Sequence, residues 1–192
     1  AGLHLAYLSS GLRYATSLSN TSAWTTTLLT AGMGDYAALA LAVDTAGNPH
    51  IAYNETGKPI YHLARSGTTW VTRTVDMPGN VSTNLALGAE TPGTAHLAYM
   101  AVEGANLAVR HAAFNGAAWI TETLAVAGPN VSGHSQSPRV LAQGGKVYVL
   151  YADCAALQAG KDYPVALILQ TLSGGLWSSQ TLYSFVGQCN WN

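Results

Sequence analysis

Three histidines at matching positions are the residues of this chain whose type most readily suggests chemistry. His4, His50 and His96 each begin a His-aliphatic-Ala-Tyr segment, and neutral imidazole is a common metal ligand. A shared metal site would require these side chains to converge from segments that start 46 residues apart. The fourth copy of the segment begins with Tyr148 instead, so it would contribute no imidazole. Repetition at one repeat position favours packing or hydrogen bonding, and we predict no metal site and no cofactor.

The histidines belong to a repeat whose spacing predicts the elements that position them. The four copies start 46, 46 and 52 residues apart, which is the length of one four-stranded propeller blade. In the second copy, residues 38–43, 50–53, 60–64 and 70–75 alternate like short strands and are separated by turn-forming residues. Each copy places His and Ala on one strand face, and the aliphatic residue and Tyr on the other. The framework positions are His4, His50, His96, Tyr7, Tyr53, Tyr99, Tyr151, Trp24, Trp70, Trp119 and Trp177.

We therefore predict an all-β fold, namely one four-bladed β-propeller domain with four antiparallel strands per blade. Three residues precede His4, so the first copy lacks a first strand, whereas residues 184–192 are left over at the end. We expect this C-terminal tail to complete the first blade, either within its own ring or in a neighbouring molecule. The predicted blades are 1–36 plus 184–192, 37–82, 83–137 and 138–183.

The composition is unusually poor in charge. Only 9% of the residues are charged, against about 25% in a typical soluble domain, and the formal net charge is −1. There is no basic field for nucleic acid, and no apolar run is long enough for a membrane span. We expect neither nucleic-acid binding nor membrane insertion. A surface with so few charges is kept soluble by polar residues, by attached sugars or by burial in an assembly.

Several features favour a secreted, extracellular or cell-surface protein. The chain starts at Ala1 without Met, as a mature or excised product would. Candidate glycosylation sequons lie at Asn20, Asn54, Asn80 and Asn130. The two cysteines, Cys154 and Cys189, are expected to form a disulfide that fastens the tail to the last repeat. The alternative, a reactive thiol or a metal-binding pair, lacks further ligands at suitable spacing.

The best-formed copy resembles a known repeat. The run from Asp44 through Gly47-Asn48-Pro49-His50 to Tyr53, followed by Gly67-x-x-Trp70, resembles a repeat of secreted bacterial β-propeller proteins. The Gly-x-x-Trp hairpin also resembles the end of the Asp-box of sialidase-type propellers, although the Ser-x-Asp half of that motif is absent. This resemblance implies an architecture, and propellers of similar architecture differ widely in activity.

No catalytic arrangement is evident in the sequence. A glycosidase needs two carboxylates held close on one face of a pocket, and the five Asp and four Glu fall mainly in predicted turns. Asp44 and Glu90 stand at matching hairpins and are expected to cap turns. Arg13 and Arg110 are repeat-equivalent, which argues against a specialised arginine cluster. We predict a non-enzymatic protein with no catalytic residues.

Aromatic residues outside the framework are the remaining candidates for binding. They are Tyr36, Tyr163, Tyr183 and Trp191, which could stack on sugar rings or fill a partner's pocket. The simpler alternative for each is a partly buried aromatic at a sheet edge. A propeller lectin would bind glycans in pockets between blades, with aromatic stacking and polar side chains.

Three functions follow in order of preference from the sequence. The first is a structural, self-assembling subunit of a filament or surface coat, with copies of itself as partners. It is favoured by the low charge and the spare C-terminal segment. The second is a carbohydrate-binding, lectin-like propeller. The third is a sialidase-like glycoside hydrolase.

Overall fold

A computed structural model describes residues 2–18, 23–32, 38–55, 57–79, 84–129, 137–154 and 163–187. All regular structure in these ranges is β, and no helix among them could span a membrane. The strands are β1 (Leu3–Leu8), β2 (Gly11–Ser17), β3 (Thr25–Ala31), β4 (Ala38–Val43), β5 (Pro49–Asn54), β6 (Ile60–Ser66), β7 (Thr69–Asp76), β8 (Ala86–Gly88), β9 (Ala95–Glu103), β10 (Asn106–Phe114), β11 (Trp119–Pro129), β12 (Arg139–Gln143), β13 (Lys146–Cys154), β14 (Tyr163–Ser173) and β15 (Leu176–Gly187).

The strands form four antiparallel sheets in chain order. The first sheet contains β1–β3, the second β4–β7, the third β8–β11 and the fourth β12–β15. Strands that are neighbours in sequence are also neighbours in each sheet, and each such pair is antiparallel. The strands expected in the second copy agree with β4 to β7 to within two residues at either end. The all-β fold and the antiparallel four-stranded unit are therefore confirmed.

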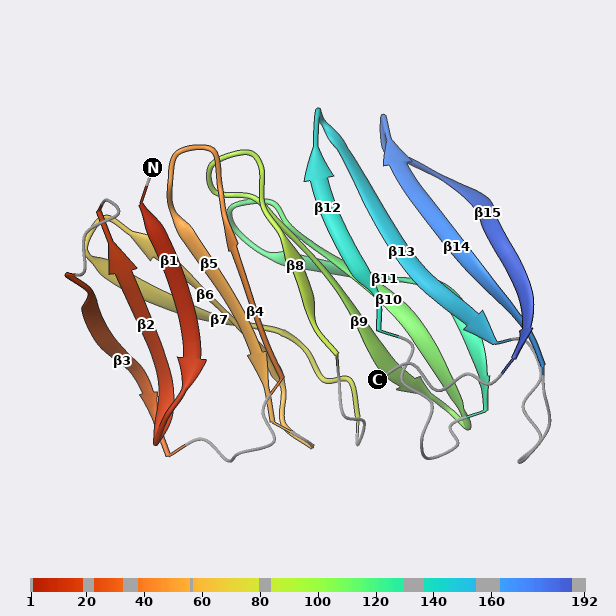
Figure 1. The fold of residues 1–192 in the computed structure, drawn as a ribbon, viewed down its shortest axis with the longest axis horizontal. Helices are drawn as coiled ribbons and strands as arrows, with labels where there is room; N and C mark the ends of the chain where they lie inside the picture. Colours follow the sequence, from red (N-terminus) through yellow and green to blue (C-terminus); the bar gives the residue numbers. More distant parts are fainter. Residues whose placement is uncertain are drawn as a thin grey trace.

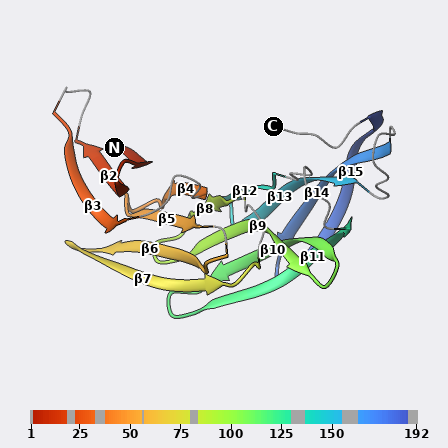
Figure 2. The same ribbon diagram turned by 90° about the horizontal axis from the view of Figure 1, so that it is seen from below.

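The four sheets stack side by side in an open arc. Figure 1 shows them in sequence order, and Figure 2 shows the first and fourth sheets at opposite ends of the arc. The first strands of successive sheets lie next to one another, with contacts between β4 and β8 and between β8 and β12. A closed ring of four blades is not confirmed, because the described first and fourth sheets do not pack on each other.

Among the described residues the first sheet has three strands, and residues 184–187 do not supply a fourth. They continue β15 and pair with residues 163–166 of β14 in the fourth sheet. The expectation that this part of the tail completes the first blade is therefore wrong. Continued pairing with β14 satisfies the backbone groups locally, without a long connection. Residues 188–192 lie outside the described part of the chain.

All four sheets share one irregularity. A β-bulge interrupts the pairing of the last two strands at the same point of every sheet. It lies between Leu12 and Arg13, Ile60 and Tyr61, Val109 and Arg110, and Leu167 and Ile168. The shared bulge aligns the copies residue by residue. It places Arg13 and Arg110 at one equivalent position, opposite Tyr7 and Tyr99.

The hydrophobic core lies between the sheets. On β5 and β9, the Ala packs towards the following sheet and the His shares its strand face, whereas the aliphatic residue and Tyr pack on the preceding sheet. The aliphatic side chains Ile51, Leu97 and Val149 are 0% exposed, because each is covered by the sheet before it. Every interior sheet is thus buried on both faces, and three separate inter-sheet clusters make up most of the core.

The same aromatic contact recurs at each of the three interfaces. The tryptophan near the start of a sheet's last strand packs edge-on against a ring on the third strand of the preceding sheet. The pairs are Trp70 on Tyr14, Trp119 on His62 and Trp177 on His111, with ring centroids 5.0, 4.9 and 5.1 Å apart. The first sheet has no sheet before it, and its equivalent residue, Trp24, is 46% exposed.

Truncating a buried interface residue should destabilise the whole array. Replacing Leu97 by Ala removes a fully buried side chain between the second and third sheets. We expect a loss of about 2–5 kcal/mol in the free energy of unfolding, measured by urea denaturation. Ile120→Ala is the matched control, because Ile120 is exposed and should change stability by less than about 1 kcal/mol. Equal effects of the two substitutions would contradict the assignment of the core.

Candidate functional site

Each framework histidine pairs with a ring of its own sheet rather than with another framework histidine. His4 Nδ1 lies 2.6 Å from the Tyr14 hydroxyl. His50 Nδ1 lies 3.1 Å from His62 Nε2, and His96 Nδ1 lies 3.0 Å from His111 Nε2. Within the described ranges, no group of three or more His, Cys, Asp or Glu side chains could hold a metal ion. The contacts of these histidines are those of packing and hydrogen-bonding positions.

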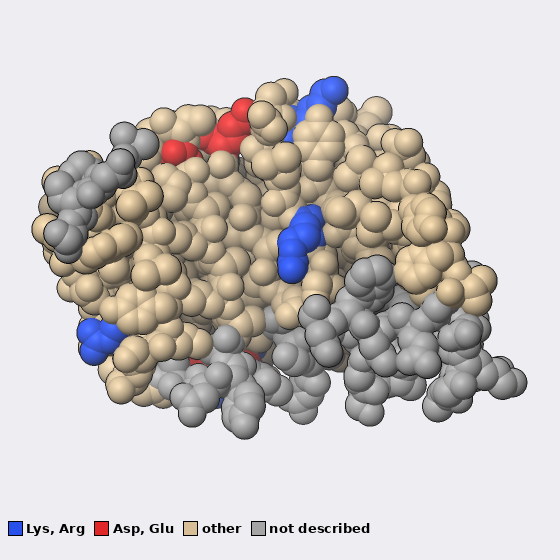
Figure 3. Space-filling view, viewed as in Figure 1, with Lys and Arg blue, Asp and Glu red and all other residues tan. Residues whose placement is uncertain are grey.

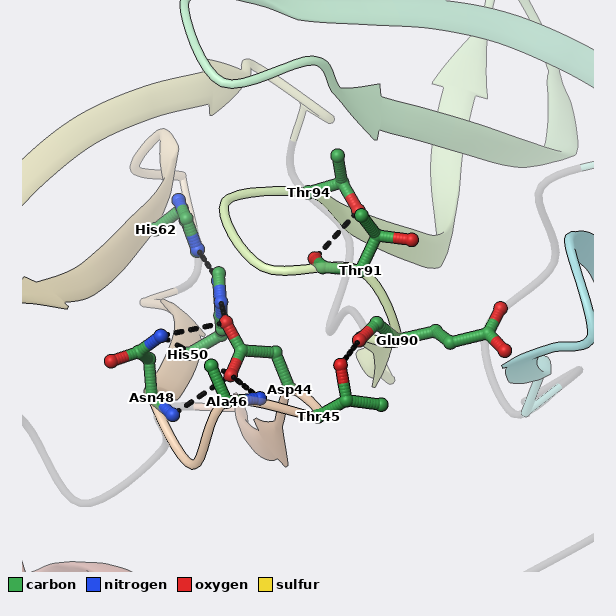
Figure 4. A network of polar contacts seen from close by, with 9 residues as sticks. All are labelled: Asp44, Thr45, Ala46, Asn48, His50, His62, Glu90, Thr91 and Thr94. Atoms are coloured by element: carbon green, nitrogen blue, oxygen red, sulfur yellow. Dashed lines mark hydrogen bonds and ion pairs between the residues drawn. The ribbon is translucent and has the colours of Figure 1, made fainter.

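The second sheet contains a buried chain of polar groups, drawn in Figure 4. Asp44 Oδ1 accepts hydrogen bonds from the backbone N–H groups of Ala46 and Asn48, at 2.9 and 2.8 Å. Asp44 Oδ2 lies 3.6 Å from His50 Nε2, and His50 in turn contacts His62. Burial alone would raise the pKa of Asp44, but the hydrogen bonds from Asn48 and Ala46 lower it. Asp44 therefore caps the turn, and buried His50 and His62 are inaccessible to a substrate.

Burial keeps the paired histidines neutral. It lowers the pKa of His62 to about 3, with smaller contributions from the nearby His50 and Arg73. It also lowers the pKa of His96 to about 4, helped by His111. His111 Nδ1 lies 2.9 Å from Glu122 Oε1, and this carboxylate only partly opposes the lowering of the His111 pKa by burial. These rings thus serve as neutral hydrogen-bonding partners at neutral pH.

Glu90 connects the hairpins of three sheets along one rim. The backbone N–H and the hydroxyl of Thr45 both donate to the Glu90 carbonyl oxygen, at 2.9 and 2.8 Å (Figure 4). The Glu90 carboxylate accepts from the backbone N–H groups of Gly144 and Gly145, at 2.6 and 3.1 Å. Both glycines have φ near +65°, a conformation that suits glycine and turns their N–H groups outward. As expected, Glu90 caps a turn, but the turn belongs to the next sheet.

A second polar cluster joins the second and third sheets on the other side of the arc. Asp76 Oδ2 accepts hydrogen bonds from the Tyr99 hydroxyl and, at 2.6 Å, from Arg110 Nη1. Arg110 Nε lies 3.6 Å from Glu103 Oε1. Tyr99 is fully buried, and burial together with Asp76 raises the pKa of its hydroxyl. Two carboxylates that share one guanidinium beside a buried tyrosine form a brace between sheets rather than an acid–base pair.

The pocket best suited to a ligand lies between the first and second sheets. Its volume is about 440 Å³, within the usual range for small-molecule sites. The rings of Tyr14 and Trp70 form one part of its lining, and Arg65 lines it from β6. The Nε of Arg65 donates to the Gly67 carbonyl oxygen at 2.9 Å, which anchors its guanidinium beside the pocket. The described residues of the lining are Tyr14, Thr16, Leu18, Ala23, Thr25, Thr27, Arg65, Thr68 and Trp70.

This lining combines aromatic surface with hydroxyl groups and one cation. Thr25, Thr27 and Thr68 offer hydroxyls that can donate and accept hydrogen bonds, whereas the Thr16 hydroxyl donates to the Leu3 carbonyl oxygen at 3.1 Å and can still accept. The described lining contains no carboxylate, the group that supplies both the acid and the nucleophile in glycoside hydrolysis. The arrangement can bind a polyhydroxylated molecule that also has an apolar face.

A smaller pocket of about 260 Å³ lies between the third and fourth sheets. The polar side chains among its described lining are Glu90, Thr91, Thr94, His96 and Lys146, and that lining contains no Trp or Tyr. The hydrogen bonds from Gly144 and Gly145 already occupy the Glu90 carboxylate. We therefore regard the pocket between the first and second sheets as the candidate site.

The structure places few of the other candidate residues in a site. Tyr183 is 63% exposed and stacks on Phe185 at the free face of the fourth sheet. Asn54 is 2% exposed and donates to the Lys58 carbonyl oxygen at 2.7 Å, so a glycan there would have to break this contact. Asn20, Asn80, Asn130, Tyr36, Trp191 and Cys189, and the side chains of Cys154 and Tyr163, lie outside the described part of the structure.

Two residues of the candidate pocket escaped the sequence reasoning. Tyr14 stands where the next two sheets have His62 and His111, and this difference is a signal visible in the sequence. Arg65 carries no such signal, because its place beside Tyr14 depends on how two separate repeats pack. The sequence predicts only a framework role for Trp70, which in the structure also lines the pocket.

Comparisons with known proteins identify the fold. No protein-family model and no curated protein sequence matches the chain. The K499G mutant of NanB sialidase from Streptococcus pneumoniae is similar in structure, with a TM-score of 0.58 and 14% identity over 93% of this chain. The chain covers only 29% of that sialidase.

The six-bladed β-propeller lectin of Aleuria aurantia is also similar, with a TM-score of 0.51 and 14% identity. The chain aligns over its full length with 75% of this lectin. The N224Q mutant of the lectin, in complex with α-methyl-L-fucoside, gives a TM-score of 0.51 and 16% identity. That alignment covers 95% of this chain and 72% of the lectin. The fold is thus that of a β-propeller, and its structural neighbours include both a sialidase and fucose-binding lectins.

Acidification should destabilise the protein through its buried histidines. In the folded state the pKa of His62 is about 3 and that of His96 about 4, against an ordinary value of 6.5. The unfolded chain therefore binds more protons below pH 6.5, so stability is complete above that pH and falls as the pH drops towards 4. By pH 5 the loss should reach at most about 2 kcal/mol per histidine, measured as the shift in urea midpoint.

The matched control for this pH effect is His62→Tyr, because the first sheet already has Tyr14 at that position against His4. In this variant the stability should no longer show the pH dependence that His62 causes, and it should keep the pH dependence that His96 causes. An unchanged slope of stability against pH would contradict the role of buried His62.

Removing the Glu90 carboxylate should weaken the rim between the third and fourth sheets. Glu90→Ala leaves the N–H groups of Gly144 and Gly145 without this acceptor. We expect a loss of about 1–3 kcal/mol in the free energy of unfolding. Glu90→Gln keeps one side-chain acceptor and should lose less. Hydrogen exchange at Gly144 and Gly145 should rise most in Glu90→Ala, and equal exchange in all three proteins would contradict the cap.

Proposed function

We propose that this protein is a carbohydrate-binding, lectin-like β-propeller and that it binds its ligand between the first and second sheets. The observation that carries the proposal is the joint presence of Trp70 and Arg65 with four threonines around one open pocket, behind which Tyr14 lies almost fully buried. A pyranose ring has hydroxyls at its rim and apolar C–H groups on its faces. It therefore matches a lining of aromatic surface, hydroxyls and a fixed guanidinium.

The electrostatics of the pocket favour a ligand rich in acceptor oxygens. Arg65 is held by its bond to the Gly67 carbonyl oxygen, so less side-chain freedom is lost when its remaining N–H groups meet a ligand. Hydrogen bonds from a charged group are stronger than those between neutral groups. A terminal sugar of a glycan, neutral or acidic, is the ligand class that these groups would recognise.

The similar structures support the lectin alternative over the other two functions. The chain covers 72–75% of the fucose-binding lectin structures but only 29% of the sialidase. The filament or coat subunit that low charge suggested gains no support from these neighbours. A hydrolase would need paired carboxylates at the pocket, and its described lining has none. We accordingly propose that the protein is non-enzymatic and binds glycans outside the cell.

The test is binding of the purified chain to a glycan array, followed by calorimetry with free L-fucose, α-methyl-L-fucoside and the strongest array ligands. Arg65→Ala should weaken binding at least tenfold, because the charge-assisted hydrogen bonds are lost. Thr25→Val, which removes one lining hydroxyl at nearly constant volume, should weaken binding by a smaller factor.

Arg139→Ala is the matched control. Arg139 also donates to a backbone carbonyl, that of Pro138, but it lies on the fourth sheet and outside the pocket. Binding that Arg139→Ala leaves unchanged and Arg65→Ala abolishes would support the site. Binding that survives both Arg65→Ala and Thr25→Val would place the site elsewhere. The absence of any glycan ligand would contradict the function.

A further inference from the structure

The two ends of the arc expose surfaces that the interior sheets bury. On the first sheet, Leu5 is 48% exposed, although its equivalents Ile51, Leu97 and Val149 are 0% exposed. Trp24, at 46%, and Leu28, at 47%, lie on the same free face. An exposed leucine whose three equivalents are fully buried, beside two further exposed hydrophobic side chains, indicates a missing neighbour on that side.

The fourth sheet has the converse surface. Leu167 is partly exposed there, although its equivalents Leu12, Ile60 and Val109 are fully buried by the sheet that follows each of them. Beside it lies an almost wholly apolar hollow of about 330 Å³, lined by Ala152, Val165, Leu167, Tyr183 and Phe185. By register these residues share the strand face opposite to Val149 and Tyr151, which pack on the third sheet. The fourth sheet forms one end of the arc in Figure 2.

These two faces are complementary halves of one interface. At each interior interface, a following sheet presents its tryptophan to the third-strand ring of the preceding sheet. The free face of the first sheet presents the tryptophan half, with Trp24. The free face of the fourth sheet presents the receiving half, with Leu169 in the place of the ring residues Tyr14, His62 and His111. Neither face matches a copy of itself, so the contact they suit is head to tail.

The position after the bulge gives a specific pair across this interface. Arg110 reaches back from the third sheet to Asp76, which lies opposite Ile60, just before the bulge of the second sheet. Arg13 has the place of Arg110 on the first sheet. On the fourth sheet the place of Asp76 is taken by Tyr183, opposite Leu167. A head-to-tail contact would thus set Arg13 beside an exposed tyrosine, which can accept a hydrogen bond and offers a ring face to the cation.

We propose that a second copy of this chain docks head to tail, the outer face of its first sheet covering the outer face of the fourth sheet. Two copies can make this contact twice, which closes the sheets into one ring and leaves neither end face exposed. A second copy is the partner because one chain carries both halves of an interface that it already forms three times internally. The low charge fits this contact, since the side chains named on the two faces include one charged group, Arg13.

The test is the mass of the 192-residue chain in solution, by sedimentation equilibrium across a wide concentration range. The expected mass is 40 kDa, twice that of the 20.0-kDa chain, or a higher multiple built from the same contact. Trp24→Lys and Tyr183→Lys should each weaken association at least tenfold. Ile120→Lys is the control, because Ile120 is 62% exposed but lies on the third sheet, away from both end faces.

Mixing the two lysine variants distinguishes a head-to-tail contact from a symmetric one. The Trp24→Lys chain keeps an intact fourth sheet and the Tyr183→Lys chain an intact first sheet, so the mixture should regain one contact and form 1:1 dimers. Circular dichroism checks that each variant is folded, and Leu28→Lys replaces Trp24→Lys if that variant is not. A wild-type monomer at every concentration, or association insensitive to either end-face lysine, would overturn the proposal.

Discussion

Packing of each sheet against the sheets on both its sides is the interaction on which the rest of this structure depends. One repeat of about 46 residues cannot bury enough apolar surface alone, so it is stable only between neighbours. The alternation of residues along β9 shows how this works. Leu97 and Tyr99 pack on the second sheet, and Ala98 packs on the fourth. Histidine pairs, polar braces and ligand-sized pockets all arise in the same inter-sheet spaces, where they vary from one interface to the next.

The interfaces contain few charged side chains. Most of these accept hydrogen bonds from backbone N–H groups or pair with another charged side chain. Asp44 and Glu90 accept hydrogen bonds from backbone N–H groups, and Asp76 joins Tyr99 to Arg110. The face drawn in Figure 3 has only scattered Lys, Arg, Asp and Glu side chains among uncharged ones. Buried histidines add polar contacts without adding charge, because their pKa values lie far below neutral pH. The stability of the contacts between sheets should therefore change little with salt concentration and fall strongly at low pH.

Local features of the fold could be predicted from the sequence, and long-range ones could not. Turn residues and alternation located the strands of the second sheet. Ring closure depends on the angle between successive sheets, which packing volumes set and no local pattern encodes. Residues 184–187 could pair with β14 or with the edge of the first sheet, and in the structure they pair with β14, which is nearer in sequence. The candidate pocket joins Tyr14 to Arg65 from another repeat, so only the folded chain brings them together.

The bulge shared by all four sheets has a consequence for how such a chain can change in length. Because the interruption falls at the same repeat position every time, each repeat ends with its last strand turned in the same way towards the next. A whole repeat is therefore an interchangeable unit. Duplication or deletion of one repeat in the gene would leave the same kind of sheet-to-sheet contact at every junction. Insertions inside a repeat are tolerated only in the turns, whereas a single residue added within a strand would invert the faces that meet its neighbours.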